Sequence, residues 1–336
     1  LRDAGKLDEL ALELRLGERA TRLDPEARTV ALEGGVELGY DELVVTTGAA
    51  PIPLPGTGGI EGVHVLRTLE HCAGLRERFA ERPRVVIVGG GFLGTEVAST
   101  ARGFDADVIL VSDLDEPLAD VLGPELAAML TGLHAEHGVD VRTGSLVEEV
   151  TADEGVATGV RLADGSTIDA DLVVVAIGAH PGTGWLEGAG LELDDGIVCD
   201  ATCRAAPGVW AAGDVARWHH EGLGRSLRIE HRTNAGMQGM AVARNILAGD
   251  DAQAYTPVPF IWTDQYELTF QIHGLPEDGE LVEVVEGSHE DRELVVAYGA
   301  EDRVVAAVGV NSPRTVRRVQ RLVADGASWD ELGSFG

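Results

Sequence analysis

Residues 84–94 read RVVIVGGGFLG, and the segment after them, TEVASTARGF (95–104), has the pattern of a helix. The apolar, mostly β-branched run predicts a buried strand that enters a glycine turn. Gly89, Gly91 and Gly94 match the spacing G-x-G-x-x-G. In that arrangement the first glycine allows the tight turn, the second lets the backbone approach a pyrophosphate, and the third lets helix and strand pack closely. The helix N-terminus also offers unpaired N–H groups to phosphates. We therefore predict a dinucleotide-binding turn; the alternative is a glycine-rich turn without a ligand.

A second apolar run, DVILVS (107–112), predicts the next strand, which ends at Ser112 and is followed at once by Asp113. An acidic residue at this position bonds the ribose 2′-hydroxyl of NAD, whereas a basic one accommodates the 2′-phosphate of NADP. Asp115 and Glu116 add two carboxylates, and no basic residue lies between 107 and 125. The segment predicts NAD as the preferred nucleotide.

Three more apolar strands end in glycine turns, at Thr47-Gly48, Ile177-Gly178 and Gly213-Asp214. Strands that alternate with helices and are apolar throughout indicate parallel sheets covered on both faces. From about Pro257 the strands alternate in polarity, as antiparallel strands do, and a helix over 312–326 follows. The chain is thus predicted to be α/β with a separate α+β module at its C-terminal end.

The composition excludes several classes of function. The chain has 336 residues, with 57 Asp and Glu against 26 Lys and Arg, and a formal net charge of −31. Nucleic acids and anionic membranes are bound through basic side chains, so neither is an expected partner. No apolar run approaches the ~18–20 residues of a membrane span. Three cysteines are too few for a disulfide framework, which favours the cytoplasm.

These motifs, in this order, resemble the FAD-dependent NAD(P)H:ferredoxin reductases, the flavoprotein components of bacterial oxygenase and cytochrome P450 systems within the pyridine nucleotide-disulfide oxidoreductase superfamily. The matching stretches include YDELVVTTGAAP, VVIVGGGFLGTEVA, ADLVVVAIGAHP, APGVWAAGDVAR, RIEHRTNAGMQG and FIWTDQY, and they extend over essentially the whole chain. The resemblance implies two doubly wound, Rossmann-like domains, with the NAD domain inserted in the FAD domain. It also implies electron transfer from NADH through FAD to a ferredoxin-like iron–sulfur protein.

The resemblance sets the expected domain order. We expect a first part of the FAD-binding domain at 1–60, an NAD-binding domain at 61–180, the second part of the FAD domain at 181–257, and a C-terminal interface domain at 258–336. The family begins with a strand–helix–strand unit that carries its own G-x-G-x-x-G for FAD. No such unit precedes Leu1, so the first part is expected to be incomplete at its N-terminus.

The resemblance also implies the residues of the site, as follows. The residues expected to contact FAD are Ala20, Thr47, Gly48, Arg67, Gly213, Asp214, Glu230, His231 and Arg232. For His231, structural hydrogen bonding is an equally weighted alternative. Those expected to contact NAD are Gly89, Gly91, Phe92, Leu93, Gly94, Glu96, Ser112, Asp113 and Gly178. Glu96 and Trp262 are expected near the reacting rings. No acid–base residue is required, because the flavin carries the chemistry, and no metal is expected.

Other candidates have simpler interpretations. Cys199 and Cys203 precede the Gly-Asp strand in a turn, so we interpret them as inert small side chains rather than a redox pair. His134 and His137 share one helical face without a third ligand, which indicates a solvated face rather than a metal site.

Four arginines form a basic face on the last predicted helix: Arg314, Arg317, Arg318 and Arg321. They are either a face paired with local acids or a docking surface for the ferredoxin. Two other functions stay open at this stage: an NAD-binding relic that has lost FAD and catalysis, and an NADH oxidase-type flavoprotein.

Overall fold

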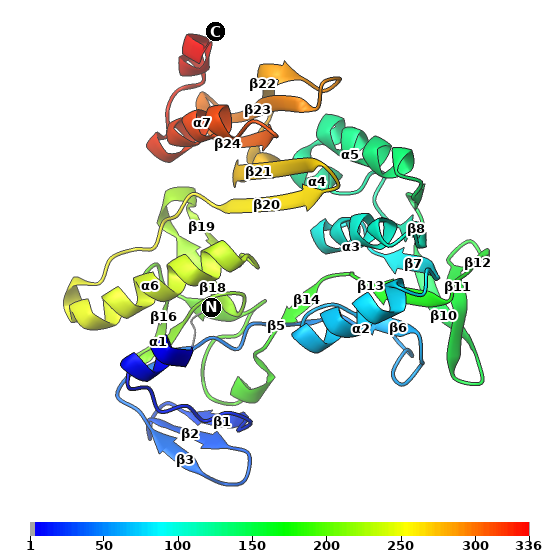
Figure 1. Ribbon diagram of the computed structural model, residues 1–336. Coiled ribbons are helices and arrows are strands. Elements are labelled where there is room, and N and C mark those ends of the chain that lie inside the picture. Colours follow the sequence, from blue (N-terminus) through cyan, green and yellow to red (C-terminus); the bar gives the residue numbers. More distant parts are fainter. Residues whose placement is uncertain (1–3, 336) are drawn as a thin grey trace. The chain divides into compact units, whose positions relative to one another are not determined.

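A computed structural model describes residues 4–335 of the chain (Figure 1). The backbone divides into two compact units. The first unit contains the residues up to Gly48 together with 181–230 and 235–256, and the second contains 49–180, 231–234 and 257–336.

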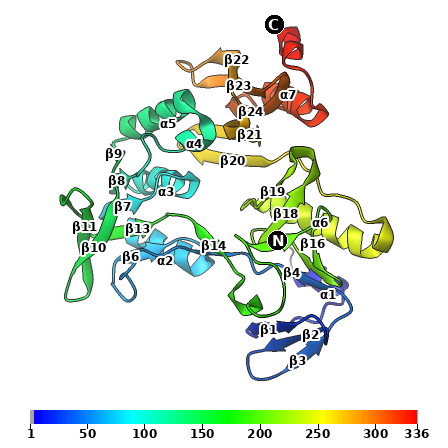
Figure 2. The same cartoon turned by 180° about the vertical axis from the view of Figure 1, so that it is seen from behind.

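The second unit contains a five-stranded parallel sheet in the order β6-β13-β7-β8-β9. Its strands are β6 (Val63–Val65), β13 (Leu172–Val175), β7 (Arg84–Val88), β8 (Asp107–Val111) and β9 (Asp140–Arg142). Helices α2 (Leu69–Phe79) and α3 (Phe92–Gly103) cover one face. An antiparallel sheet of β10 (Val147–Asp153), β11 (Val156–Leu162) and β12 (Thr167–Asp169) covers the other (Figures 1 and 2).

The sequence of β7 explains its central place. Val85 and Ile87 pack toward the helices, whereas Val86 and Val88 pack toward the antiparallel sheet. Successive residues of a strand point to opposite faces, so a strand covered on both faces must be apolar throughout. The predicted buried strand is confirmed.

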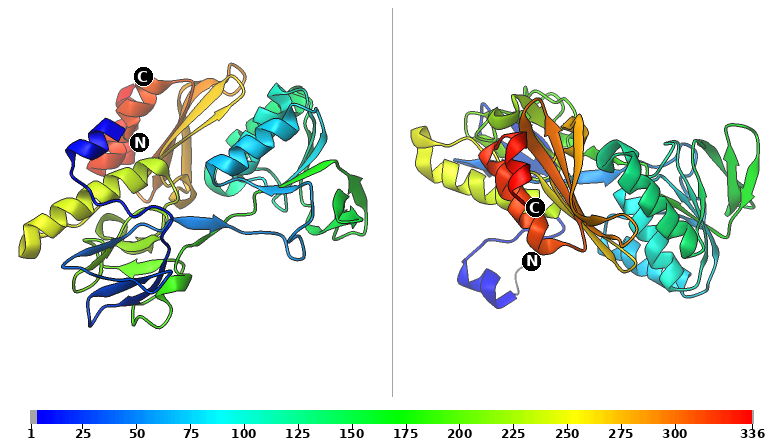
Figure 3. Two further views of the ribbon diagram at one scale, coloured as in Figure 1. Left: turned by 60° about the horizontal axis from the view of Figure 1, so that its bottom comes forward. Right: turned by 90° about the horizontal axis from the view of Figure 1, so that it is seen from above.

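The C-terminal residues form a second sheet of this unit, antiparallel and ordered β20-β21-β24-β23-β22. Its strands are β20 (Phe260–Gln265), β21 (Leu268–Gly274), β22 (Leu281–Ser288), β23 (Glu293–Ala300) and β24 (Arg303–Val310). Helix α7 (Pro313–Asp325) packs on one face (Figure 3). The other face packs on α4 (Ala119–Leu122) and α5 (Pro124–Glu136). The short helices η4 (Pro276–Asp278) and η5 (Trp329–Phe335) complete this part.

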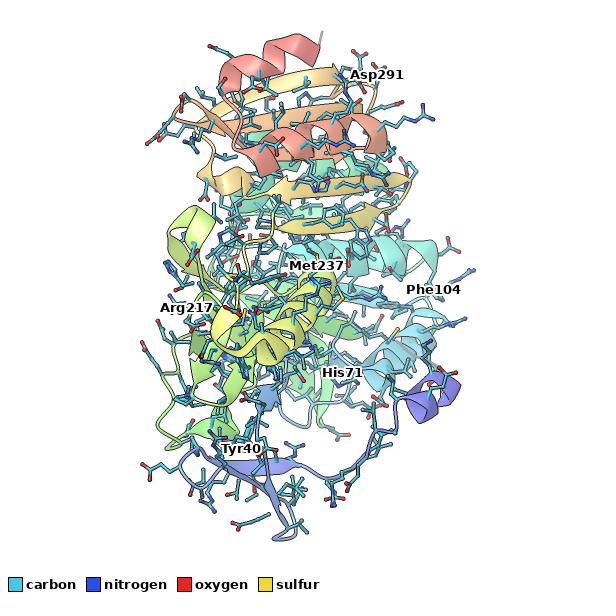
Figure 4. All side chains as sticks on the ribbon, turned by 90° about the vertical axis from the view of Figure 1, so that its left-hand side faces the viewer. Tyr40, His71, Phe104, Arg217, Met237 and Asp291 are labelled. Atoms are coloured by element: carbon cyan, nitrogen blue, oxygen red, sulfur yellow. The ribbon has the colours of Figure 1, made fainter. Side chains whose placement is uncertain are left out.

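The first unit contains three small sheets. They are formed by β1 (Ala20–Asp24), β2 (Thr29–Leu32) and β3 (Glu37–Gly39); by β15 (Ile197–Cys199), β18 (Ala216–His220) and β19 (Arg225–Leu227); and by β16 (Arg204–Ala206), β17 (Val209–Ala211) and β4 (Leu43–Val45). Its helices are α1 (Ala4–Glu9), η1 (Gly184–Leu186), η2 (Glu221–Leu223), η3 (Gly249–Asp251) and most of α6 (Arg232–Ala248), on which Figure 4 labels Met237. Trp210 and Trp218 are fully buried at its centre, and the Trp218 indole N–H donates to the carbonyl of Tyr255 at 2.9 Å.

Two short strands, β5 (Ala49–Pro51) and β14 (Ala179–Pro181), pair with each other where the chain passes between the units. The second unit therefore interrupts the first in sequence. The parallel sheet and the separate antiparallel sheet confirm the predicted α/β class with an α+β C-terminal part.

Candidate functional site

The glycines between β7 and α3 have the geometry of a dinucleotide turn. Gly89 has a φ of +114°, and a Cβ there would lie 2.3 Å from the carbonyl oxygen of Ala176. A Cβ on Gly94 would lie 1.9 Å from the carbonyl oxygen of Gly89, so helix and turn approach too closely for a side chain. Gly91, the N-cap of α3, has open space around it and no side-chain cap. The space on the Cβ side of Gly91 is therefore empty, and the N-terminus of a helix such as α3 offers its first N–H groups to an anion.

The carboxyl ends of β13, β7 and β8 meet at one edge of the parallel sheet, because the three strands are parallel neighbours. This edge brings Gly178, Gly89 and Ser112 close together in the fold. The chain proceeds from β7 toward β8 and β9, and later returns to the other side of β7 as β13. Such a reversal point is where open α/β sheets bind ligands.

The turn after β8 carries the residues that the sequence predicts to face a ribose. Ser112 is buried, and its hydroxyl accepts a hydrogen bond from the N–H of Leu114 at 3.2 Å. Asp113 and Asp115 are exposed. The structure adds a residue that sequence reasoning missed, Arg142, which pairs with Val111 across β9 and β8. Its guanidinium donates to Asp140 at 3.0 Å, so its charge is neutralised locally. No local sequence pattern singles out Arg142, because only the pairing of β9 with β8 brings it to this edge of the sheet.

Glu96 lies on the second turn of α3, where strand β20 packs against the helix. Its Oε1 accepts a hydrogen bond from the Thr263 hydroxyl at 2.7 Å. Burial raises the pKa of Glu96, the Thr263 hydrogen bond partly offsets this, and the charge of Asp264 adds to the increase. Thr263 had not been singled out in the sequence.

Two pairs of rings involve α3 and β20 in the second unit. The Phe92 ring meets the His231 ring edge-on, with centroids 6.4 Å apart. Trp262, on β20, is 40% exposed and stacks on Phe260 with centroids 5.9 Å apart. Leu93 is exposed at the start of α3. A half-exposed indole can offer a flat surface to a planar ring.

In the first unit, the predicted flavin residues lie at two strand ends that are neighbours, since β4 and β17 are parallel. Thr47 donates from its hydroxyl to the carbonyl of Gly182 at 2.7 Å. Gly213 has a φ of +77°, and its buried N–H donates to Gln238 of α6 at 2.8 Å. This bond fixes the turn and leaves Asp214 half-buried after the strand end.

The remaining predicted flavin residues are placed as follows. Ala20 begins β1, and Glu230 is exposed at the end of the 181–230 segment of the first unit. Arg67 is exposed before α2, and Arg232 is exposed at the start of α6. They are distributed over both units, and each stays a prediction.

Cys199 and Cys203 are buried and free, and burial raises the pKa of both thiols. A thiol whose pKa is raised is a poor nucleophile, which supports the interpretation as inert side chains.

The prediction of a solvated His134 is wrong. His134 is fully buried, because α5 packs against the C-terminal sheet, and its Nδ1 lies 3.0 Å from the hydroxyl of Tyr266. Burial lowers the pKa of His134 to about 4. Within residues 4–335, no group of three or more His, Cys, Asp or Glu side chains could hold a metal. None of the helices in that range combines the length and apolar character that a membrane crossing requires.

The comparisons with known proteins identify the class. The family model for pyridine nucleotide-disulphide oxidoreductases matches residues 4–239, and the model for the reductase C-terminal domain matches residues 260–332. The chain therefore belongs to the pyridine nucleotide-disulphide oxidoreductase family. A member solved from Desulfovibrio vulgaris, 26% identical over 94% of this chain and 84% of its own, is described as FAD-dependent.

Within that family the chain is similar to reductases of oxygenase systems. It is 35% identical to the ferredoxin–NAD(+) reductase component of the anthranilate 1,2-dioxygenase system of Burkholderia cepacia, over 98% of this chain and 81% of the relative. It is also 35% identical to putidaredoxin reductase of Pseudomonas putida, over 94% of this chain and 75% of the relative. The structure of a covalent putidaredoxin reductase–putidaredoxin complex matches with a TM-score of 0.92 at 34% identity, over 99% of this chain and 81% of that chain.

These findings confirm the predicted family, fold class and enzyme class: the chain is a ferredoxin–NAD(P)(+) reductase-type oxidoreductase. FAD and a nicotinamide dinucleotide are the cofactors of this family, as predicted. The empty space beside Gly91 at the N-terminus of α3 suits the pyrophosphate of a nucleotide, and the hydrogen bond from the Gly213 N–H to Gln238 holds the turn that precedes Asp214.

Proposed function

We propose that this chain transfers electrons from NADH through FAD to an acidic iron–sulfur protein of the ferredoxin type. FAD, when bound, supplies the conversion between two-electron and one-electron transfer. The protein's own residues bind and orient the two cofactors, and they exclude water from the site. The observation that carries the proposal is the turn at Gly91, which is open to an anion and followed at the next strand end by exposed carboxylates.

We assign the nucleotide to the carboxyl edge of the parallel sheet. The N–H groups at the start of α3 would hold its pyrophosphate, and Asp113 would accept from the ribose hydroxyls. Ser112, Gly178, Phe92 and Leu93 would line the nucleotide at the same edge, and Gly89 and Gly94 shape the turn. Glu96 follows on α3, so the nicotinamide ring would lie beside its carboxyl group.

We assign the ribityl chain of the flavin to the strand-end turns of the first unit. There, Thr47-Gly48 and Gly213-Asp214 lie side by side at the ends of two parallel strands. The Asp214 carboxylate would accept from a ribityl hydroxyl. Arg228 supports this turn, since its guanidinium donates to the carbonyl of Asp214 at 3.3 Å and pairs with Asp195 at 2.9 Å. The remaining predicted contacts and the four-segment domain order are part of this proposal.

We assign the docking of the acceptor to α7. Val316 and Val319 are buried against the C-terminal sheet, so the opposite face of this helix is exposed. Its exposed arginines are Arg314, Arg317, Arg318 and Arg321. A chain of net charge −31 repels an acidic partner at long range, but the Debye length of ~8 Å lets a local basic face dominate at contact.

Three free cysteines fit a reducing cytoplasm.

The experiment uses the chain loaded with FAD. Its absorption spectrum should show bound flavin that NADH bleaches, and a colourless chain that stays so with added FAD would contradict the proposal. Reversal of Arg317 and Arg318 to Glu should slow electron transfer to ferredoxin while NADH-driven reduction of ferricyanide stays unchanged.

A control with the same charge change is Arg22→Glu with Arg82→Glu. Both side chains are exposed and lie outside α7. If the two double variants lower ferredoxin reduction equally, net charge rather than α7 governs docking. If ferricyanide and ferredoxin reduction fall together, the α7 arginines stabilise the fold instead.

A further inference from the structure

A buried row of polar side chains joins the C-terminal sheet to the first turns of α3. Its members are Thr95 and Glu96 of α3 and Thr263 and Gln265 of β20. Thr95 and Gln265 are fully buried, and Thr263 is 1% exposed. Polar groups removed from water to this degree are costly unless their hydrogen bonds are made, so the row constrains the side chains that form it.

The direction of each hydrogen bond follows from the donors and acceptors that are available. The Thr95 hydroxyl lies 3.1 Å from the carbonyl oxygen of Gly91 and 3.0 Å from that of Phe92. Carbonyl oxygens only accept, so the single proton of Thr95 is directed to them. The Thr95 oxygen must then accept the Gln265 amide N–H, which lies at 2.9 Å.

Two further hydrogen bonds extend the row from Gln265 to Glu96. The Gln265 amide nitrogen also lies 2.9 Å from the Thr263 hydroxyl oxygen, to which it donates. The proton of Thr263 is thereby left for Glu96 Oε1, at 2.7 Å. Among the described residues, the buried Gln265 amide oxygen has no hydrogen-bond donor, whereas its amide nitrogen serves both the Thr95 and the Thr263 oxygens. In this orientation the row ends in the Thr263 hydroxyl, which donates to Glu96.

We propose that Thr263 and Gln265 are positioning residues for Glu96, holding its Oε1 as a hydrogen-bond acceptor and favouring the anionic form of the carboxyl group. This inference rests on the proposed function only in placing Glu96 beside the nicotinamide. A negative charge there favours the positively charged oxidised ring over the neutral reduced ring, and so favours hydride release.

The other groups near Glu96 do not replace the hydrogen bond that the Thr263 hydroxyl donates. Asp264 on β20 carries a charge of the same sign, which raises the Glu96 pKa, as burial does. Arg76 and Cys72 of α2 line the same cavity of about 250 Å³ as Glu96, and Arg76 is exposed to solvent. Loss of the Thr263 hydroxyl would leave burial and Asp264 to act together, so the Glu96 carboxyl group should titrate at higher pH.

The test is a pH titration of Glu side chains labelled with ¹³C at the δ-carboxyl carbon, followed by NMR. The Glu96 signal is identified by its loss in Glu96→Gln. Thr263→Val should move the Glu96 titration to higher pH, and Thr263→Ser, which keeps the hydroxyl, should retain the wild-type midpoint. If Thr263→Val does not fold, Gln265→Met should shift the titration in the same direction. An unchanged Glu96 midpoint in the folded variant overturns the proposal.

Thr315→Val is the matched control, because the Thr315 hydroxyl also donates to a glutamate, Glu286, at 2.8 Å. It should leave the Glu96 midpoint unchanged, and an equal shift there would overturn the proposal. The ratio of NAD⁺ to NADH affinity, measured across the same pH range, is the second readout. If the Glu96 titration moves while this ratio does not depend on pH, the positioning role is supported and the assignment of Glu96 to the nicotinamide is wrong.

Discussion

Replacement of Asp113 should change which nicotinamide nucleotide the chain binds. Asp113 and Asp115 are exposed in the turn after β8, where the ribose of a nucleotide held by the Gly91 turn would lie. The nucleotides differ there by a 2′-phosphate, which carries a charge of about −1.5 to −2 at pH 7.

The size of the effect follows from Coulomb's law. A charge of about −2 and one carboxylate ~6 Å apart in water repel each other by ~1.4 kcal/mol, which is a factor of ten in affinity. The second carboxylate adds to this, and salt reduces it because the Debye length is comparable to the separation. Arg142 offsets little, since its guanidinium pairs with Asp140. We expect the chain to prefer NADH to NADPH by at least about tenfold.

The assay is a fluorescence titration of the chain with NADH and with NADPH, which needs no electron acceptor. Asp113→Asn should narrow the gap between the two dissociation constants, and Asp113→Arg should narrow it further. Asp140→Asn should also narrow it by releasing Arg142. The control is Asp105→Asn, on the turn between α3 and β8, where Asp105 pairs with Arg82 at 3.2 Å. Equal affinity of the wild-type chain for both nucleotides would refute the reasoning. No change in Asp113→Arg would show that Asp113 does not face the ribose.

Three further predictions concern the flavin, the turn and pH. Asp214→Ala should weaken FAD binding about tenfold or more, since a hydrogen bond to a charged group contributes ~1.5–3 kcal/mol, and unchanged affinity in a flavin titration would show that the motif is only a turn. Gly94→Ala should lower the free energy of unfolding in denaturant by ~1–3 kcal/mol, because the new Cβ would lie 1.9 Å from the Gly89 carbonyl oxygen. The control Gly74→Ala should not lower it, because a Cβ at Gly74 on α2 would lie in open space. Burial lowers the pKa of His134 in the folded chain to about 4, below its ordinary value of 6.5. The unfolded chain therefore binds the proton first, and the free energy of unfolding should fall as pH drops from about 6.5 to 4. His134→Gln should make this dependence shallower and the exposed His219→Gln should not; equal slopes would contradict the buried, neutral state.

Much of the second unit could be predicted from the sequence because its signals are local. The strand before Gly89 is apolar from Val85 to Val88, and a run of that kind is typical of a strand between two covering layers. The helix after Gly91 needs no side-chain cap if a ligand or water meets its first N–H groups. Both features depend on residues within one turn or strand of each other, so spacing alone is sufficient to predict them.

The environment of His134 shows where such reasoning fails. The residues around it on α5 do not show which surface will cover that face of the helix. The covering surface is the C-terminal sheet, whose residue Tyr266 is 132 positions away in sequence. A histidine on a helix face is exposed or buried according to that distant element, and helical periodicity carries no information about it.

The sequence by itself determined the glycine turn, the acidic end of the second strand and the apolar strands of the parallel sheet, because backbone sterics and side-chain alternation act between neighbours. Only the tertiary structure decided that Thr263 meets Glu96 across 167 positions, and that Arg142 lies beside the end of β8. Those contacts depend on how whole sheets and helices bury their apolar faces against one another. That choice belongs to the folded core rather than to any segment of the chain.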